Sequence, residues 1–136
     1  MTAVVTDMEA GIEHLKRGTL EHAEILLIVV EPYFKSLEAA GRIAELARGL
    51  GVPTLYAVAN KVQSERDEAA IRAYCAEHDL PVLAVVPFDA EVSEAEREGI
   101  AILDSAPEAA AVGAIEEVAR ALRAADRYCM EARVAD

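Results

Sequence analysis

The stretch Thr54-Leu55-Tyr56-Ala57-Val58-Ala59-Asn60-Lys61 decides the fold of this chain. Its first six residues favour a strand and show no alternation of polar and apolar positions, which is typical of a strand covered on both faces. The run then ends in an amide and a cation, Asn60 and Lys61. In open α/β sheets, ligands bind where the carboxyl ends of the strands meet. The stretch therefore predicts a buried parallel strand that leads to a binding site.

Two further apolar runs, at residues 25–30 and 82–86, have the same continuous character. Segments with helical period lie between the three runs, and such alternation specifies a parallel sheet. The sequence therefore predicts an α/β fold, a three-layer parallel sheet with flanking helices. A shorter strand is predicted at residues 3–6, ending at Asp7.

The helix boundaries are predicted from capping residues. Ser36 is expected to cap the first helix, and Ser64-Glu65-Arg66-Asp67 resembles a capping box that opens the second. A short acidic helix is expected at residues 91–98, and Ser105-Ala106-Pro107-Glu108 is expected to cap the last helix. The residues of that helix predicted to face the sheet are Val112, Ile115, Val118, Ala119 and Leu122.

Length and composition fit one globular domain over residues 1–136, with 126–136 expected as a weakly helical or frayed tail. The chain is 54% hydrophobic and 28% charged, with a net charge of −12. This acidic balance argues against nucleic acid and anionic lipid as partners. No signal peptide is visible, and the longest apolar run is too short to cross a bilayer. Cys75 falls on the apolar stripe of a predicted helix and is expected to be a small core residue. Neither Cys75 nor Cys129 suggests a disulfide framework, so a soluble protein of the reducing cytoplasm is expected.

Four predicted strand ends carry polar or turn-forming residues and are expected to line one crevice. They are Asp7, Glu31-Pro32, Asn60-Lys61 and Pro87-Phe88-Asp89. Asp7 could hold Mg²⁺ through water, although helix capping or a turn is the alternative role for an aspartate after a strand. The Asn60 amide offers a donor and an acceptor, which match the edge of adenine, and capping of the turn is its alternative role.

No segment of the chain has the pattern G-x-x-x-x-G-K-[ST] that cradles nucleotide phosphates. Without such a loop, ATP hydrolysis by this chain alone has no visible physical basis, and tight ATP binding is not expected either. The chain thus has a predicted base-binding strand but no phosphate-binding loop.

Several motifs together resemble a known family. They are Asp7-Met8-Glu9-Ala10-Gly11-Ile12-Glu13-His14-Leu15 with the following Arg17-Gly18-Thr19, the strand end Asn60-Lys61-Val62, the turn Pro87-Phe88-Asp89, and the pattern G-x-x-I-x-D-S-A-P at residues 99–107. These motifs occur in the same order and at similar spacing in the MinD/ParA-type (SIMIBI) P-loop ATPases, and roughly residues 3–125 resemble the C-terminal half of that family's domain. Within them, the chain is most similar to the accessory ATPases that insert nickel into carbon monoxide dehydrogenase.

The resemblance implies roles for individual residues. Asp7 would match the switch II aspartate near Mg²⁺, Gly11 the glycine that senses the γ-phosphate, and Asn60 the residue that reads adenine. The loop beside the base would consist of Pro87, Phe88 and Asp89. The segment that rearranges with nucleotide state and touches a partner subunit would include Glu9, Glu13, His14 and Arg17.

The family's Walker A loop, its switch I with the catalytic aspartate, and the C-x-C metal pair of the nickel ATPases are missing from the chain. The resemblance therefore implies no catalytic residue in this chain. It implies that ATP or ADP binds with Mg²⁺ only when an N-terminal half is supplied. A nickel site built from His14 and His22 is not expected.

The resemblance implies a truncated or split ATPase that contributes switch II and adenine recognition to carbon monoxide dehydrogenase maturation. A non-catalytic interaction or dimerisation module is the alternative, and a flavodoxin-like or receiver-like domain is a weaker third reading. An exposed strand edge, where the phosphate-loop strand of the family would lie, predicts a homodimer or a complementary N-terminal half as partner. Carbon monoxide dehydrogenase itself is a further partner that the resemblance suggests.

Overall fold

The computed structural model describes residues 3–8, 18, 20 and 22–135, with side chains described up to residue 125. Three strands, β1 (Ile25–Val30), β2 (Thr54–Val62) and β3 (Val82–Pro87), form a parallel sheet in the order β1-β2-β3. The predicted α/β fold with a parallel sheet is confirmed. Strand β2 continues past Ala59, the end that the sequence predicted, to Val62.

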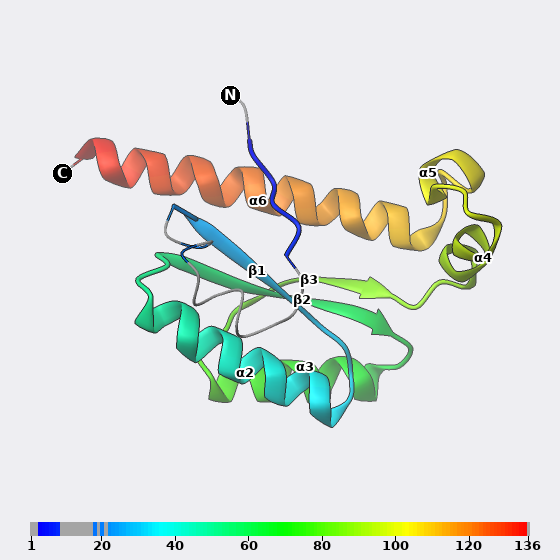
Figure 1. Ribbon diagram of the computed structural model, residues 1–136, viewed down its shortest axis with the longest axis horizontal. Coiled ribbons are helices and arrows are strands. Elements are labelled where there is room, and N and C mark those ends of the chain that lie inside the picture. The colour runs from blue at the N-terminus through cyan, green and yellow to red at the C-terminus, as the bar shows by residue number, and fades with distance from the viewer. Residues whose placement is uncertain (1–2, 9–17, 19, 21, 136) are drawn as a thin grey trace.

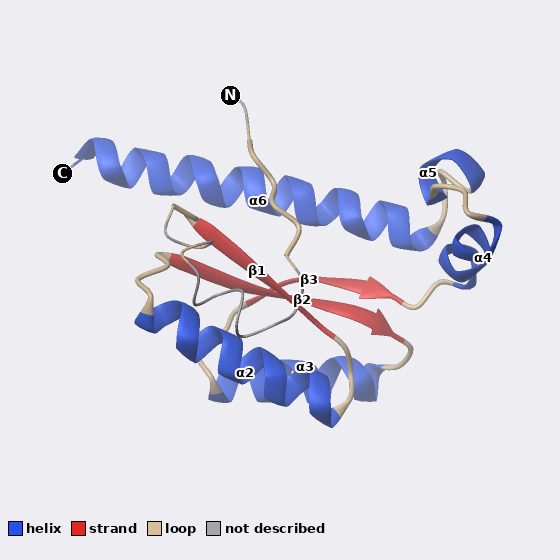
Figure 2. Cartoon of the chain, viewed as in Figure 1, coloured by secondary structure: helices blue, strands red, loops and turns tan. Residues whose placement is uncertain are grey.

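The sheet is the middle of three layers, as Figures 1 and 2 show. Helices α2 (Phe34–Gly49) and α3 (Glu65–Glu77) cover one face, and α6 (Ala110–Ala135) covers the other. Two short helices, α4 (Ala90–Glu98) and α5 (Ile102–Ser105), lie beyond the carboxyl end of β3 and lead the chain to the start of α6.

Alternate strand residues point to opposite faces, so the sheet has two cores. The larger core lies between the sheet and helices α2 and α3, and includes Val30, Ala57, Ala59, Ile71 and Cys75. The smaller core lies under α6. It consists of Val58, Val86 and Ala111, with Leu27, Ala114 and Val118 partly buried beside them.

Two predicted helix starts are wrong. Helix α2 begins at Phe34, and the Ser36 hydroxyl accepts a 2.8 Å hydrogen bond from the backbone N–H of Glu31 instead of capping the helix. Ser105 is the last residue of α5, and α6 begins at Ala110. The Ser64 cap is confirmed, since its hydroxyl accepts from the Asp67 N–H at 3.1 Å.

The face of α6 that meets the sheet is also shifted from the prediction. Ala111, Ala114 and Val118 pack against the strands. Ile115, which the helical period placed on that face, is 54% exposed. Because Ala111 and Ala114 are small, α6 can lie close to β2 and β3.

The predicted strand at residues 3–6 is not a strand. Residues 3–8 have no regular secondary structure, and the side chains of Val4 and Val5 are exposed. A strand needs a hydrogen-bonded neighbour, and the segment joins no sheet. Within the described residues, β1 is therefore an edge strand whose only partner is β2.

The helices in the described part of the chain include no segment that is both long and apolar enough to span a membrane.

Cys75 is buried in the larger core, as its position on the apolar stripe of α3 predicted. Burial raises the pKa of its thiol above the ordinary value of 9.0. Because only the thiolate reacts with alkylating agents, we expect Cys75 in a Cys129→Ser variant to resist iodoacetamide at pH 8 until the protein is unfolded in urea. Mass spectrometry of the native and the unfolded protein measures this, and equal alkylation in both states would contradict the burial.

Candidate functional site

A β-bulge forms where β2 ends. Ala59 pairs with Val85 and Val62 pairs with Pro87, so three steps along β2 match two steps along β3. The extra residue lies in the pair Asn60-Lys61, and Lys61 has a φ of 54°. Such bulges often occur beside active sites, where they redirect side chains.

The alternation of the strand assigns Asn60 to one face of the sheet. Val58 belongs to the core under α6, whereas Ala57 and Ala59 belong to the core under α2 and α3. Asn60, two residues beyond Val58, therefore lies on the α6 face, and it is partly buried. Ala111, the second residue of α6, packs against Val58. The amide thus lies at the edge of the sheet toward which the amino end of α6 is directed (Figure 1).

An ion pair joins the carboxyl ends of β1 and β2. The ammonium of Lys61 lies 2.7 Å from Glu31 Oε1, and Glu31 directly follows β1. The hydrogen bond and the charge of Glu31 raise the pKa of Lys61, and the charge of Glu96 on α4 raises it further. The sequence marked Glu31 as a strand end but gave no sign of this pairing.

Asp89 forms hydrogen bonds with two of the helices that follow β3, namely α4 and α6. Its Oδ1 accepts a hydrogen bond from the Glu91 N–H at the start of α4, and its Oδ2 accepts one from the Ala111 N–H in α6, both at 3.0 Å. The carboxylate also complements the positive ends of both helix dipoles. Asp89 therefore fixes the amino end of α6 next to the strand ends.

The loop after β3 lies directly beside the end of β2. The Phe88 N–H donates to the Val62 carbonyl at 3.0 Å, and Pro87 pairs with Val62. The Phe88 side chain is 47% exposed, so its ring is available to contact a ligand. Asn60 and the turn Pro87-Phe88-Asp89 thus belong to one edge of the sheet.

The structure describes the other predicted site residues only in part. Asp7 is exposed and lies in the irregular segment 3–8, so it ends no strand of the described sheet. Gly11 and the expected partner-contacting residues, namely Glu9, Glu13, His14 and Arg17, lie outside the described residues. Among residues 3–8, 18, 20 and 22–135, no three His, Cys, Asp or Glu side chains gather as metal ligands would.

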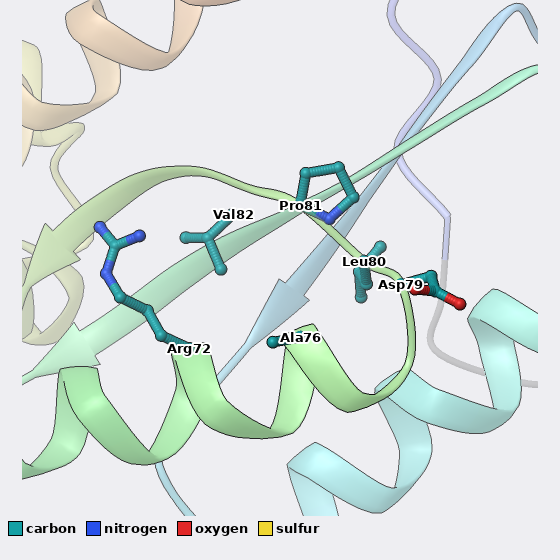
Figure 3. Close-up of a pocket in the computed structure, with 6 residues that line it drawn as sticks. All are labelled: Arg72, Ala76, Asp79, Leu80, Pro81 and Val82. Atoms are coloured by element: carbon teal, nitrogen blue, oxygen red, sulfur yellow. The ribbon is translucent and has the colours of Figure 1, made fainter.

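A shallow surface depression lies at the opposite edge of the sheet, near the amino end of β3 (Figure 3). Its lining residues come from α3, the loop after it and β3, and they are Arg72, Ala76, Asp79, Leu80, Pro81 and Val82. This depression is separated by the length of β3 from the edge that carries Asn60 and Phe88.

Two curated proteins illustrate the similarity of the chain to known sequences. The chain is 42% identical to the carbon monoxide dehydrogenase accessory protein CooC of Rhodospirillum rubrum over 104 residues, 76% of this chain and 39% of that protein. It is 45% identical to an uncharacterized ATP-binding protein of Methanocaldococcus jannaschii over 93 residues, 68% of this chain and 36% of that protein. The chain thus spans less than half the length of these relatives. No protein-family model matches it.

Solved structures share the fold. The MinD cell division protein of Aquifex aeolicus has a TM-score of 0.66 at 20% identity, over 77% of this chain and 46% of that one. The septum site-determining protein MinD of Pyrococcus horikoshii, complexed with Mg-ADP, has a TM-score of 0.58 at 29% identity, over 71% and 40%. The chain is therefore homologous to the accessory protein CooC and has, in part, the P-loop ATPase fold of MinD and ParA.

Proposed function

We propose that this chain forms the adenine-binding part of a MinD/CooC-like ATPase, in which Asn60 reads the edge of the base and Phe88 packs beside it. The observation that supports the proposal is that Asn60 lies in the bulge at the carboxyl end of β2, the edge where open α/β sheets bind ligands. The last residue of this strand, Val62, pairs with the turn that carries the exposed Phe88. Similarity to an ATP-binding protein over 68% of the chain supports the choice of nucleotide.

The described residues fit the base of a nucleotide but not its phosphates. The amide of Asn60 provides both a donor and an acceptor for adenine. The ammonium of Lys61 is already paired with Glu31, and the 136 residues contain no phosphate loop. We therefore assign the phosphates and catalysis to a segment that corresponds to the part of the relatives not matched by this chain. That segment completes the site either in the same protein or as a separate subunit.

Within such a complete site, Asp7 would lie near the Mg²⁺ through water and Gly11 near the γ-phosphate. Glu9, Glu13, His14 and Arg17 would contact the partner subunit. By analogy with CooC, the assembled ATPase would serve the maturation of carbon monoxide dehydrogenase by nickel insertion in the cytoplasm. Nickel itself is assigned to no residue of this chain.

Binding of nucleosides tests the proposal without the need for a phosphate loop. In an NMR titration of ¹⁵N-labelled protein, we expect millimolar adenosine to shift the amide signals of Asn60, Lys61 and Phe88, and guanosine to shift them less. An amide that pairs with adenine through two hydrogen bonds discriminates by about 1–3 kcal/mol. Asn60→Ala should therefore remove most of the preference, whereas Gln63→Ala, which truncates a neighbouring exposed amide, should keep it.

Equal shifts with both nucleosides, or shifts confined to the depression around Arg72 and Pro81, would contradict adenine reading. The second candidate function, a non-catalytic interaction module, is favoured by the lack of a phosphate loop in the sequence. It predicts no shift with any nucleoside and no heat on addition of Mg-ATP or Mg-ADP.

The partner is proposed to cover the edge of β1. No described residue pairs with the outer side of this strand, and Val29 on its α6 face is 60% exposed. Open strand edges favour pairing with another chain. Size-exclusion chromatography with light scattering should therefore give a dimer or a complex with the phosphate-binding segment, and a stable monomer at micromolar concentration would contradict this.

A further inference from the structure

Lys61 adopts a backbone conformation that lysine avoids. Only two described non-glycine residues have a positive φ, namely Lys61 at 54° and Asp79 at 52°. Asp79 follows the end of α3, where its N–H bonds to the Ala76 carbonyl, and aspartate tolerates this conformation at such a position. Lys61 lies in the bulge that ends β2, and a non-glycine residue with this conformation is under strain there. Strain of this kind persists where the surrounding structure fixes the residue.

Glu31 contacts the side chain of Lys61. The ammonium of Lys61 contacts the Glu31 carboxylate at 2.7 Å, and the Glu31 side chain is only 23% exposed. Glu31 is itself held, because its backbone N–H donates to the Ser36 hydroxyl in the first turn of α2. A continuous set of contacts thus runs from α2 through Glu31 to Lys61, the residue next to Asn60.

We propose that Glu31 is a positioning residue for Asn60: by holding the ammonium of Lys61, it fixes the bulge that presents the Asn60 amide to the base. The inference rests on the proposed function for what the amide reads, but the fixing of the bulge is independent of any nucleotide. An ion pair this exposed adds little to overall stability, so the effect of removing it is expected at the bulge and not in global unfolding.

The test compares Glu31→Gln, which removes only the charge, with the wild type and with Lys61→Arg, which keeps the pair. The first readout is amide hydrogen exchange by NMR at Lys61, Val62 and Phe88. We expect Glu31→Gln to speed exchange there about two- to fivefold, the size that a surface ion pair supports, with the melting temperature unchanged. Lys61→Arg should keep the slow exchange.

The Lys61→Gly variant distinguishes the effect of backbone strain at residue 61 from the effect of the ion pair on the position of Asn60. Glycine adopts a positive φ freely, so this variant should keep or raise the melting temperature while it loses the ion pair and the preference for adenosine. Asp79→Gly is the matched control, because it relieves a positive φ at the opposite edge of the sheet. It should leave both the exchange at the bulge and the nucleoside preference unchanged.

The outcomes distinguish the inference from the proposed function. Unchanged exchange at Lys61 and Val62 in Glu31→Gln would overturn the positioning role, whatever the protein binds. Faster exchange in a protein that binds no adenosine would keep Glu31 as the residue that fixes the bulge and would refute adenine binding. Faster exchange together with a weakened preference for adenosine over guanosine supports both.

Discussion

Replacement of Ile71 by alanine is expected to lower the free energy of unfolding by about 2–5 kcal/mol, the usual cost of emptying a fully buried site. Ile71 lies in α3, has no exposed surface, and is the largest fully buried side chain among the described residues. It packs in the core that joins the sheet to α2 and α3. Urea denaturation followed by circular dichroism measures the change.

The same substitution at Ile115 is a matched control. Ile115 also lies inside a long helix, but its side chain is 54% exposed. Truncation there removes little buried surface, and alanine favours the helix, so a change within about 0.5 kcal/mol is expected. Similar losses at both positions would contradict the burial of Ile71 and the exposure of Ile115.

Replacement of Asp89 by alanine is expected to lower the free energy of unfolding by about 1–4 kcal/mol, because it removes the caps of two helices at roughly 0.5–2 kcal/mol each. One carboxylate oxygen serves α4 and the other serves α6. Asparagine keeps a single acceptor oxygen and turns a donor toward the other N–H, so Asp89→Asn should fall between the wild type and Asp89→Ala.

Asp104→Ala provides the control for this series, since Asp104 is exposed on the short helix α5. Chemical denaturation should rank the four proteins as wild type and Asp104→Ala first, Asp89→Asn next and Asp89→Ala last. Equal stability of the two Asp89 variants would contradict the capping role, because the acceptor oxygen that asparagine keeps would then stabilise neither helix.

The sequence predicted the sheet well because its strands are specified locally. The runs at residues 25–30, 54–59 and 82–86 are apolar on both faces, and the structure confirms all three as parallel strands. The apolar stripe of the second predicted helix likewise predicted Cys75 as a core residue, and Cys75 is buried. Asn60 stood out because an amide rarely ends so apolar a run, and the edge where it lies follows from the parallel topology alone.

The remaining features depend on contacts between distant residues. The cap of α6 comes from Asp89, 22 positions before Ala111, so the nearer Ser105 was a misleading signal. Ser36 bonds backward to Glu31 instead of forward into its own helix. The bulge arises only when β2 pairs with β3, and the Glu31–Lys61 pair arises only when β1 and β2 lie side by side. Residues 3–6 have the composition of a strand, but strand formation also needs a partner, which composition does not supply.

Nuclear Overhauser effects between adenosine and the protein give the sharpest test of adenine reading by Asn60, because they report which side chains touch the base. We expect contacts from adenine H2 and H8 to the Phe88 ring and to the Asn60 side-chain amide. Contacts to Ala76, Pro81 or Val82, which line the depression at the opposite edge of the sheet, would contradict it.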